Sequence, residues 1–183
     1  MNIYLLRHAS AGTSRINPVV DRKRPLDKEG KRYCLQLAHV LNAMKLQFDL
    51  IVSSPLKRSM QTASLVGTEM GYEAPIRSSA ALAPAATFTE FQKLLRECTE
   101  HENLLLVGHN PNLTGFVGSL LVPAAKGSDG SDGQAAVRLR KGSLARLNFT
   151  RGPATLLWLL DPRTVRALYD TSTAKSRKKT SRK

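Results

Sequence analysis

Short apolar runs alternate with segments of helical periodicity along most of the chain, and this alternation restricts the possible fold more than any other feature. The apolar runs have the length and composition of buried strands and occupy residues 2–7, 49–53, 75–77 and 103–107. The helical segments occupy residues 28–45, 54–70, 87–99 and 111–121. Strands that alternate with helices predict an α/β fold, a three-layer α/β/α sandwich with helices on both faces of a mostly parallel sheet.

The last part of the chain follows a different pattern. Residues 143–149 and 154–160 predict a hairpin of two strands that turns at Arg151-Gly152-Pro153. Residues 123–135 are rich in Gly, Ser and Asp, which predicts a flexible loop. A length of 183 residues suits one domain. We expect this domain at residues 1–170 and a basic, disordered tail at residues 171–183.

Positive charge dominates the chain, with 28 Lys and Arg against 14 Asp and Glu. The tail from residue 171 onward holds six bases and no acid, and removing them from the formal net charge of +14 leaves +8 for residues 1–170. A body with this charge favours anionic substrates. The tail is either a solvated end or an electrostatic contact for polyanions. The tail lacks the interleaved aromatic residues on which proteins stack the bases of single-stranded nucleic acids. Specific nucleic-acid recognition is therefore not expected.

Several classes of protein are disfavoured by what the sequence lacks. No apolar run approaches the roughly 20 residues of a membrane helix, and the first residues have no signal-peptide pattern. The four histidines and two cysteines show no metal-ligand spacing, and Cys34 and Cys98 form no disulfide framework. We therefore expect a cytoplasmic protein with no membrane contact, no metal and no cofactor.

Polar residues with phosphate chemistry follow three of the predicted strands. Arg7-His8 ends the first strand, Ser53–Arg58 (SSPLKR) follows the second, and Gly108–Pro111 (GHNP) follows the strand at residues 103–107. The carboxyl ends of parallel strands meet at one edge of a sheet, so we expect these residues to form one pocket. Ser54 is predicted to cap the helix that follows, with Pro55 at its first position.

The residue types of this pocket are suited to phosphoryl transfer. The planar guanidinium of arginine matches phosphate oxygens, and a helix that starts after Ser54 would add backbone N–H donors. A neutral histidine can attack phosphorus and form a covalent phosphohistidine, which water then hydrolyses. A backbone acceptor on the other ring nitrogen would fix the tautomer of such a nucleophile. A second histidine could stabilise charge on the phosphoryl oxygens, and no metal is required.

Three motifs in this order resemble the histidine phosphatase (phosphoglycerate mutase-like) superfamily: LLRHA at 5–9, SSPLKR at 53–58 and VGHNP at 107–111. The resemblance covers about residues 1–162. RPL at 24–26 and LWLLDP at 157–162 are similar to its SixA-like branch. The resemblance implies a phosphoglycerate mutase-like fold, His8 as nucleophile, Arg7 and Arg58 as phosphoryl ligands, and His109 as the residue that completes the pocket.

Two further residues are candidates for substrate binding. Arg24 could join the rim of the pocket, although the cluster Arg22-Lys23-Arg24 could instead be solvated. Asn110 follows His109 and could instead cap the next helix. Ala9 stands where the superfamily most often has Gly, which requires that the backbone there avoid a conformation open only to Gly.

The sequence also departs from the superfamily in lacking a general acid. Ester-cleaving members carry an acid after the third strand or after the second histidine, whereas residues 78–89 contain no Asp or Glu and position 110 is Asn. An alkoxide leaving group needs such an acid, but an imidazole can leave as a neutral molecule. We therefore predict a phosphatase that acts on phosphohistidine in proteins. The alternatives are a phosphatase of small phosphoesters or other metabolites, and a phosphate- or polyanion-binding module with little catalysis.

Overall fold

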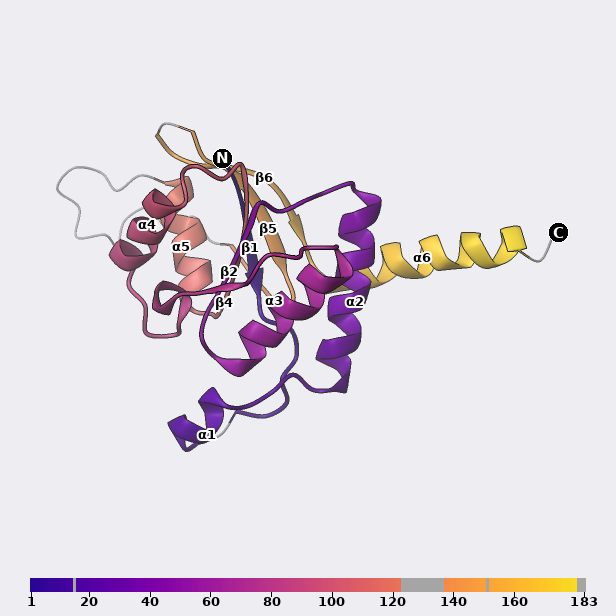
Figure 1. Ribbon diagram of the computed structural model, residues 1–183, viewed down its shortest axis with the longest axis horizontal. Coiled ribbons are helices and arrows are strands. Elements are labelled where there is room, and N and C mark those ends of the chain that lie inside the picture. Colours follow the sequence, from indigo (N-terminus) through magenta and orange to yellow (C-terminus); the bar gives the residue numbers. More distant parts are fainter. Residues whose placement is uncertain (15, 123–136, 151, 181–183) are drawn as a thin grey trace.

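The computed structural model describes residues 1–14, 16–122, 137–150 and 152–180, and its centre is a six-stranded sheet (Figure 1). The strands are β1 (Asn2–Arg7), β2 (Leu50–Ser53), β3 (Arg77–Ser78), β4 (Asn103–Gly108), β5 (Leu144–Asn148) and β6 (Thr155–Leu160). Their spatial order is β3-β2-β4-β1-β5-β6. The first four of these strands in space are parallel, whereas β5 and β6 are antiparallel to their neighbours. The predicted mostly parallel sheet and its final hairpin are both confirmed.

Helices cover both faces of the sheet (Figure 1). The helices are α1 (Pro18–Arg22), α2 (Lys28–Ala43), α3 (Lys57–Glu69), α4 (Phe88–Glu97), α5 (Asn112–Leu121) and α6 (Pro162–Thr180), with a 3-10 turn at Ala80–Leu82. Successive residues of β1 point to opposite faces: Ile3 and Leu5 pack with α4 and α5, whereas Tyr4 and Leu6 pack with α2 and α3. All four side chains are buried, which explains why β1 has a continuous apolar run and no polar alternation.

Local capping fixes the ends of two predicted helices. The Asp27 carboxylate accepts from the Gly30 N–H at 2.7 Å and caps the start of α2. Thr87 and Glu90 form a reciprocal capping box at the start of α4. The predicted cap of α3 was wrong, because this helix begins at Lys57 and its N-cap residue is Leu56, which offers no side-chain acceptor.

The structure contains two helical segments that the sequence pattern did not indicate. Helix α1 lies between the first predicted strand and the first predicted helix, and none of its residues is buried, so no apolar stripe indicated it. Helix α6 runs through Thr180, although a disordered tail was predicted from residue 171. Ala, Lys and Arg favour helices, and no Gly or Pro interrupts this stretch. The predicted loop at 123–135 and Arg151 of the predicted turn lie outside the described residues.

Within the described part of the chain, no helix is both long and apolar enough to cross a membrane.

Candidate active site

Three neighbouring parallel strands bring the predicted site residues to one edge of the sheet. Strand β4 lies between β1 and β2, and the pairing places Arg7 beside Gly108 and Ser53 beside Val107. The three strands therefore end at the same level. The segments that follow them start from adjacent positions, as the alternation of strands and helices predicted.

Backbone hydrogen bonds continue past the strand ends and hold the two predicted site histidines next to each other. The His8 N–H donates to the Gly108 carbonyl at 3.0 Å. The rings of His8 and His109 have centroids 4.9 Å apart, and their side chains are almost completely buried, with 6% and 2% of the residue surface exposed. The sequence placed both histidines at strand ends, and the structure brings them together.

His8 is held as a neutral ring with one defined tautomer. Its Nδ1 lies 2.8 Å from the Ala9 carbonyl oxygen, which can only accept, so Nδ1 carries the proton and Nε2 keeps its lone pair. Burial lowers the pKa of His8 to about 3, helped by the positive charges of Arg58, Arg7 and Lys141. The lone pair of Nε2 is therefore available at neutral pH, as a nucleophile at phosphorus requires.

Ala9 is part of the same framework. Its N–H donates to the Thr62 hydroxyl on α3 at 3.1 Å, and its side chain is fully buried. Among the described residues outside glycine, only Lys45 has a positive φ, so Ala9 needs no conformation reserved for Gly. Alanine at this position is compatible with the site.

His109 contacts two serine hydroxyls that the sequence analysis did not assign to it. The His109 Nε2 atom lies 2.9 Å from Ser54 Oγ and 3.1 Å from Ser59 Oγ. Burial lowers the pKa of His109 to about 2, with further effects of His8, Arg58 and Arg7. When the hydroxyls donate to Nε2, the ring proton lies on Nδ1, which has no hydrogen-bond partner among the described residues. This proton is then available for a phosphoryl oxygen.

Arg7 and Arg58 each use one guanidinium nitrogen for a protein acceptor. Arg7 Nη1 donates to the Leu139 carbonyl at 2.9 Å, and Arg58 Nη1 donates to the Asp21 carbonyl at 2.9 Å. The Nε atom of each guanidinium has no partner within the described residues. Burial lowers the pKa of both groups, but guanidinium groups stay charged in proteins. Two fixed cations with unused donors therefore flank the histidine pair.

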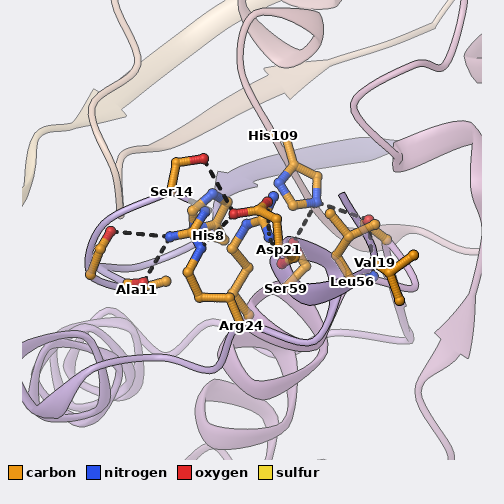
Figure 2. Close-up of polar contacts among 12 residues, drawn as sticks. His8, Ala11, Ser14, Val19, Asp21, Arg24, Leu56, Ser59 and His109 are labelled. Carbon is orange, nitrogen blue, oxygen red and sulfur yellow. Dashed lines mark hydrogen bonds and ion pairs between the residues drawn. The ribbon is translucent and has the colours of Figure 1, made fainter. Parts of the chain in front are cut away.

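Asp21 is a site component that the sequence analysis missed. It lies on α1, where its carboxylate accepts from Arg24 Nε at 2.8 Å and lies 3.2 Å from Arg58 Nη1 (Figure 2). Arg24 Nη1 also donates to the Ala11 carbonyl at 2.7 Å. Arg24 thus supports the residue that holds Arg58, which argues against a purely solvated role. The available signal was a basic residue three positions after Asp21, just beyond the end of α1.

Asn110 does not cap the helix that follows it. The N-cap of α5 is Pro111, and no side chain bonds to the first turn. The Asn110 amide instead donates to the Leu139 carbonyl at 2.9 Å, the same oxygen that accepts from Arg7. Asn110 thereby helps to fix the backbone that orients Arg7.

The part of the chain that the structure describes contains no cluster of three or more His, Cys, Asp or Glu side chains that could hold a metal ion.

Comparisons with known proteins agree with the motifs. A family model described as the histidine phosphatase superfamily (branch 1) matches residues 3–84. An uncharacterized protein of Picosynechococcus sp. is 34% identical over 116 residues, which are 62% of this chain and 68% of that protein. The chain belongs to the histidine phosphatase superfamily. The resemblance found in the sequence is confirmed, and a phosphatase is the activity that this membership supports.

Solved structures with the same fold include SixA proteins. The protein histidine phosphatase SixA in complex with tungstate has a TM-score of 0.76 and 20% identity, and the match covers 90% of this chain and 99% of that one. A SixA protein from Agrobacterium tumefaciens has a TM-score of 0.71 and 25% identity, with coverage of 88% and 97%. These matches confirm the phosphoglycerate mutase-like fold and support the SixA-like branch.

Proposed function

We propose that this phosphatase hydrolyses phosphohistidine in proteins through a covalent phosphohistidine intermediate on His8. The observation that carries the proposal is the state of His8. Its ring is buried and neutral, its Nδ1 proton is fixed on the Ala9 carbonyl, and its pKa of about 3 keeps Nε2 unprotonated beside two guanidinium groups.

The reaction has two steps in this proposal. In the first, the lone pair of His8 Nε2 forms a bond to phosphorus while the bond from phosphorus to the substrate imidazole breaks. The leaving nitrogen keeps the electron pair of that bond and takes a proton from solvent. In the second step, water attacks the phosphorus, the bond to His8 breaks, and a proton of the water passes to solvent. Inorganic phosphate leaves, and His8 returns to its neutral state.

The remaining site residues stabilise the transferred group in both steps. Arg7 and Arg58 provide fixed positive charge and unused N–H donors for the equatorial oxygens, and His109 provides the Nδ1 proton. As charge develops on the His8 ring, the hydrogen bond to the Ala9 carbonyl stabilises it. No step requires a metal or cofactor in this proposal.

We favour a phosphoramidate substrate over a phosphate ester because of where the Asp and Glu side chains lie. Residues 78–89, which follow β3, contain no Asp or Glu, and Asn110 occupies the position after His109. Asp21 is the carboxylate that the structure adds near the pocket, but it already accepts from Arg24 and lies against Arg58. We assign Asp21 to the positioning of Arg58 and not to proton donation.

The fold alone does not distinguish this substrate from others. Alpha-ribazole phosphatase from Shigella flexneri has the same fold, with a TM-score of 0.69 and 18% identity. Small phosphoesters therefore form the second candidate class of substrate. The chemistry of the leaving group separates the two classes, because only the alkoxide requires a general acid.

The deciding experiment compares phosphate release from two peptides that differ only in phosphohistidine or phosphoserine. A positioned acid contributes about 10²- to 10⁴-fold, so we expect phosphohistidine to react at least about 100-fold faster. His8→Asn should abolish release, and rapid quenching of the wild type should trap phosphate on His8. Equal rates for the two peptides would refute the phosphoramidate preference. Absence of a trapped intermediate would contradict His8 as the nucleophile and favour a binding module.

A further inference from the structure

A basic hollow of about 310 Å³ lies beside the nucleophile and is not used by the proposed mechanism. Ser10, two residues after His8, lines it. The other walls come from the first turns of α2, from the turn before β5 and from the start of α6. The hollow therefore lies between the catalytic strand end, α2 and two segments from the end of the chain.

Strand direction explains why these segments reach the site. Strand β5 is antiparallel to β1, so its first residue, Leu144, pairs with Leu6 near the catalytic end of β1. Strand β6 is antiparallel to β5, so its last residue, Leu160, pairs with Leu144. The turn before β5 and the residues after β6 consequently lie at the same edge of the sheet as His8.

The turn that enters β5 is joined directly to the catalytic backbone. The Ser143 N–H donates to the Arg140 carbonyl at 2.8 Å and closes the turn. The Gly142 N–H lies 3.0 Å from the Arg7 carbonyl oxygen and 3.2 Å from the His8 carbonyl oxygen. Lys141, the residue before Gly142, is thereby held at the side of the nucleophile. Its positive charge contributes to the low pKa of His8, which agrees with this position.

The two acids in the hollow are already paired. Asp161 lies 3.7 Å from Arg140, and Glu29 lies 2.7 Å from Arg166. The other two bases of the lining, Lys141 and Arg163, are exposed and form no ion pair with any described residue. Four bases against two acids leave a net charge of +2 in the lining. Two cations are therefore available to an anion that enters the hollow.

We infer that this hollow is a second anion-binding subsite, which binds a carboxylate of an acidic residue that flanks the phosphohistidine of the protein substrate. The inference rests on the proposed function, because it assigns a substrate class to the same site. Lys141 and Arg163 bind the carboxylate while Arg7 and Arg58 bind the phosphoryl group. The phosphatase thereby prefers phosphohistidine in an acidic sequence context. This preference does not involve the catalytic residues, because Lys141 and Arg163 are not among the four side chains that contact the phosphoryl group in the proposed reaction.

The test measures binding without turnover, in the His8→Asn background. Two phosphohistidine peptides are compared, one with Glu at the flanking positions and one with Gln. The Glu peptide should bind about fivefold more tightly, which is the size expected for partly exposed charge pairs, and added salt should reduce this ratio. Lys141→Gln with Arg163→Gln should bring the ratio to about one, and Lys141→Arg should keep it.

A matched control removes two exposed cations from the opposite face of the sheet, Lys93→Gln with Arg96→Gln on α4. The ratio should persist in this control, because it changes the net charge equally but leaves the hollow intact. A ratio of one in the His8→Asn protein, or equal losses in both double variants, would overturn the subsite. Failure of the wild type to hydrolyse phosphohistidine would instead overturn the proposed function, and a ratio lost only with Lys141 and Arg163 would still establish the subsite.

Discussion

Mild acid should destabilise the folded protein through its two adjacent buried histidines, His8 and His109. Burial lowers the pKa of His8 from its ordinary 6.5 to about 3 and the pKa of His109 to about 2. Between pH 6.5 and about 3, the unfolded chain binds a proton at each histidine and the folded protein does not. The free energy of unfolding must therefore fall as the pH decreases through this window, and the stabilisation is fully present only above pH 6.5.

The magnitude follows from the difference in bound protons. One histidine with a pKa of 6.5 in the unfolded chain and a much lower pKa in the folded protein costs about 2 kcal/mol between pH 7 and pH 5. Both histidines together cost about 4 kcal/mol, which is a large share of the roughly 5–15 kcal/mol of stability that single domains have. The expected loss in the free energy of unfolding is thus large enough to be measured by equilibrium denaturation.

Urea unfolding at pH 7, 6 and 5, followed by fluorescence of the single Trp158, measures this loss. The loss between pH 7 and 5 should be smaller by about 2 kcal/mol in His109→Asn, because that variant has one proton-binding difference fewer. Val66→Ala, a fully buried site that does not titrate, should lower stability equally at each pH and keep the loss of the wild type. An unchanged loss in His109→Asn would refute the reasoning that His109 is neutral and buried.

Two further predictions concern the support of the site. Asp21→Asn should lower kcat/KM about tenfold, because Arg58 loses a charged partner, whereas Asp170→Asn at an exposed position of α6 should leave kcat/KM unchanged in steady-state kinetics. Gly30→Ala should lower stability by about 3 kcal/mol in thermal denaturation, because the added Cβ would lie 2.0 Å from the Ser10 carbonyl. Gly115→Ala, also within a helix but with nothing within 4 Å of its Cβ, should instead raise stability by about 0.5–1 kcal/mol.

The catalytic strand ends could be predicted because their signals are local. A strand buried on both faces needs an unbroken apolar run, so the polar Arg7-His8 pair marks where β1 leaves the core. The same contrast marks His109 after β4. Parallel strands then bring these ends to one edge of the sheet, and the order β2-β4-β1 makes them neighbours. The sequence therefore located the two histidines and Arg7 correctly relative to the sheet.

The partners of these residues could not be predicted because they depend on contacts between distant segments. Serine is a residue type that often caps helices, yet the Ser54 hydroxyl lies against His109, 55 residues away in the sequence. The helix therefore starts later, at Lys57, with no side-chain cap. Asp21 lies on a short helix without buried residues, so no apolar periodicity in the sequence indicated this helix. Ser54 was therefore assigned to the local role of a cap, and Asp21 was given no role.

The rule that function lies at the carboxyl ends of strands also omits the backbone contacts made by the segment before β5. That rule describes parallel strands, whereas an antiparallel strand brings its amino end to the same edge of the sheet. Strand β5 does this, and the residues just before it supply the Leu139 carbonyl that accepts from Arg7 and the Gly142 N–H that lies against the His8 carbonyl. Because these contacts use backbone atoms, they have no side-chain signature in the sequence. A mixed sheet should therefore be searched for site residues at the entrances of its antiparallel strands as well as at the ends of its parallel ones.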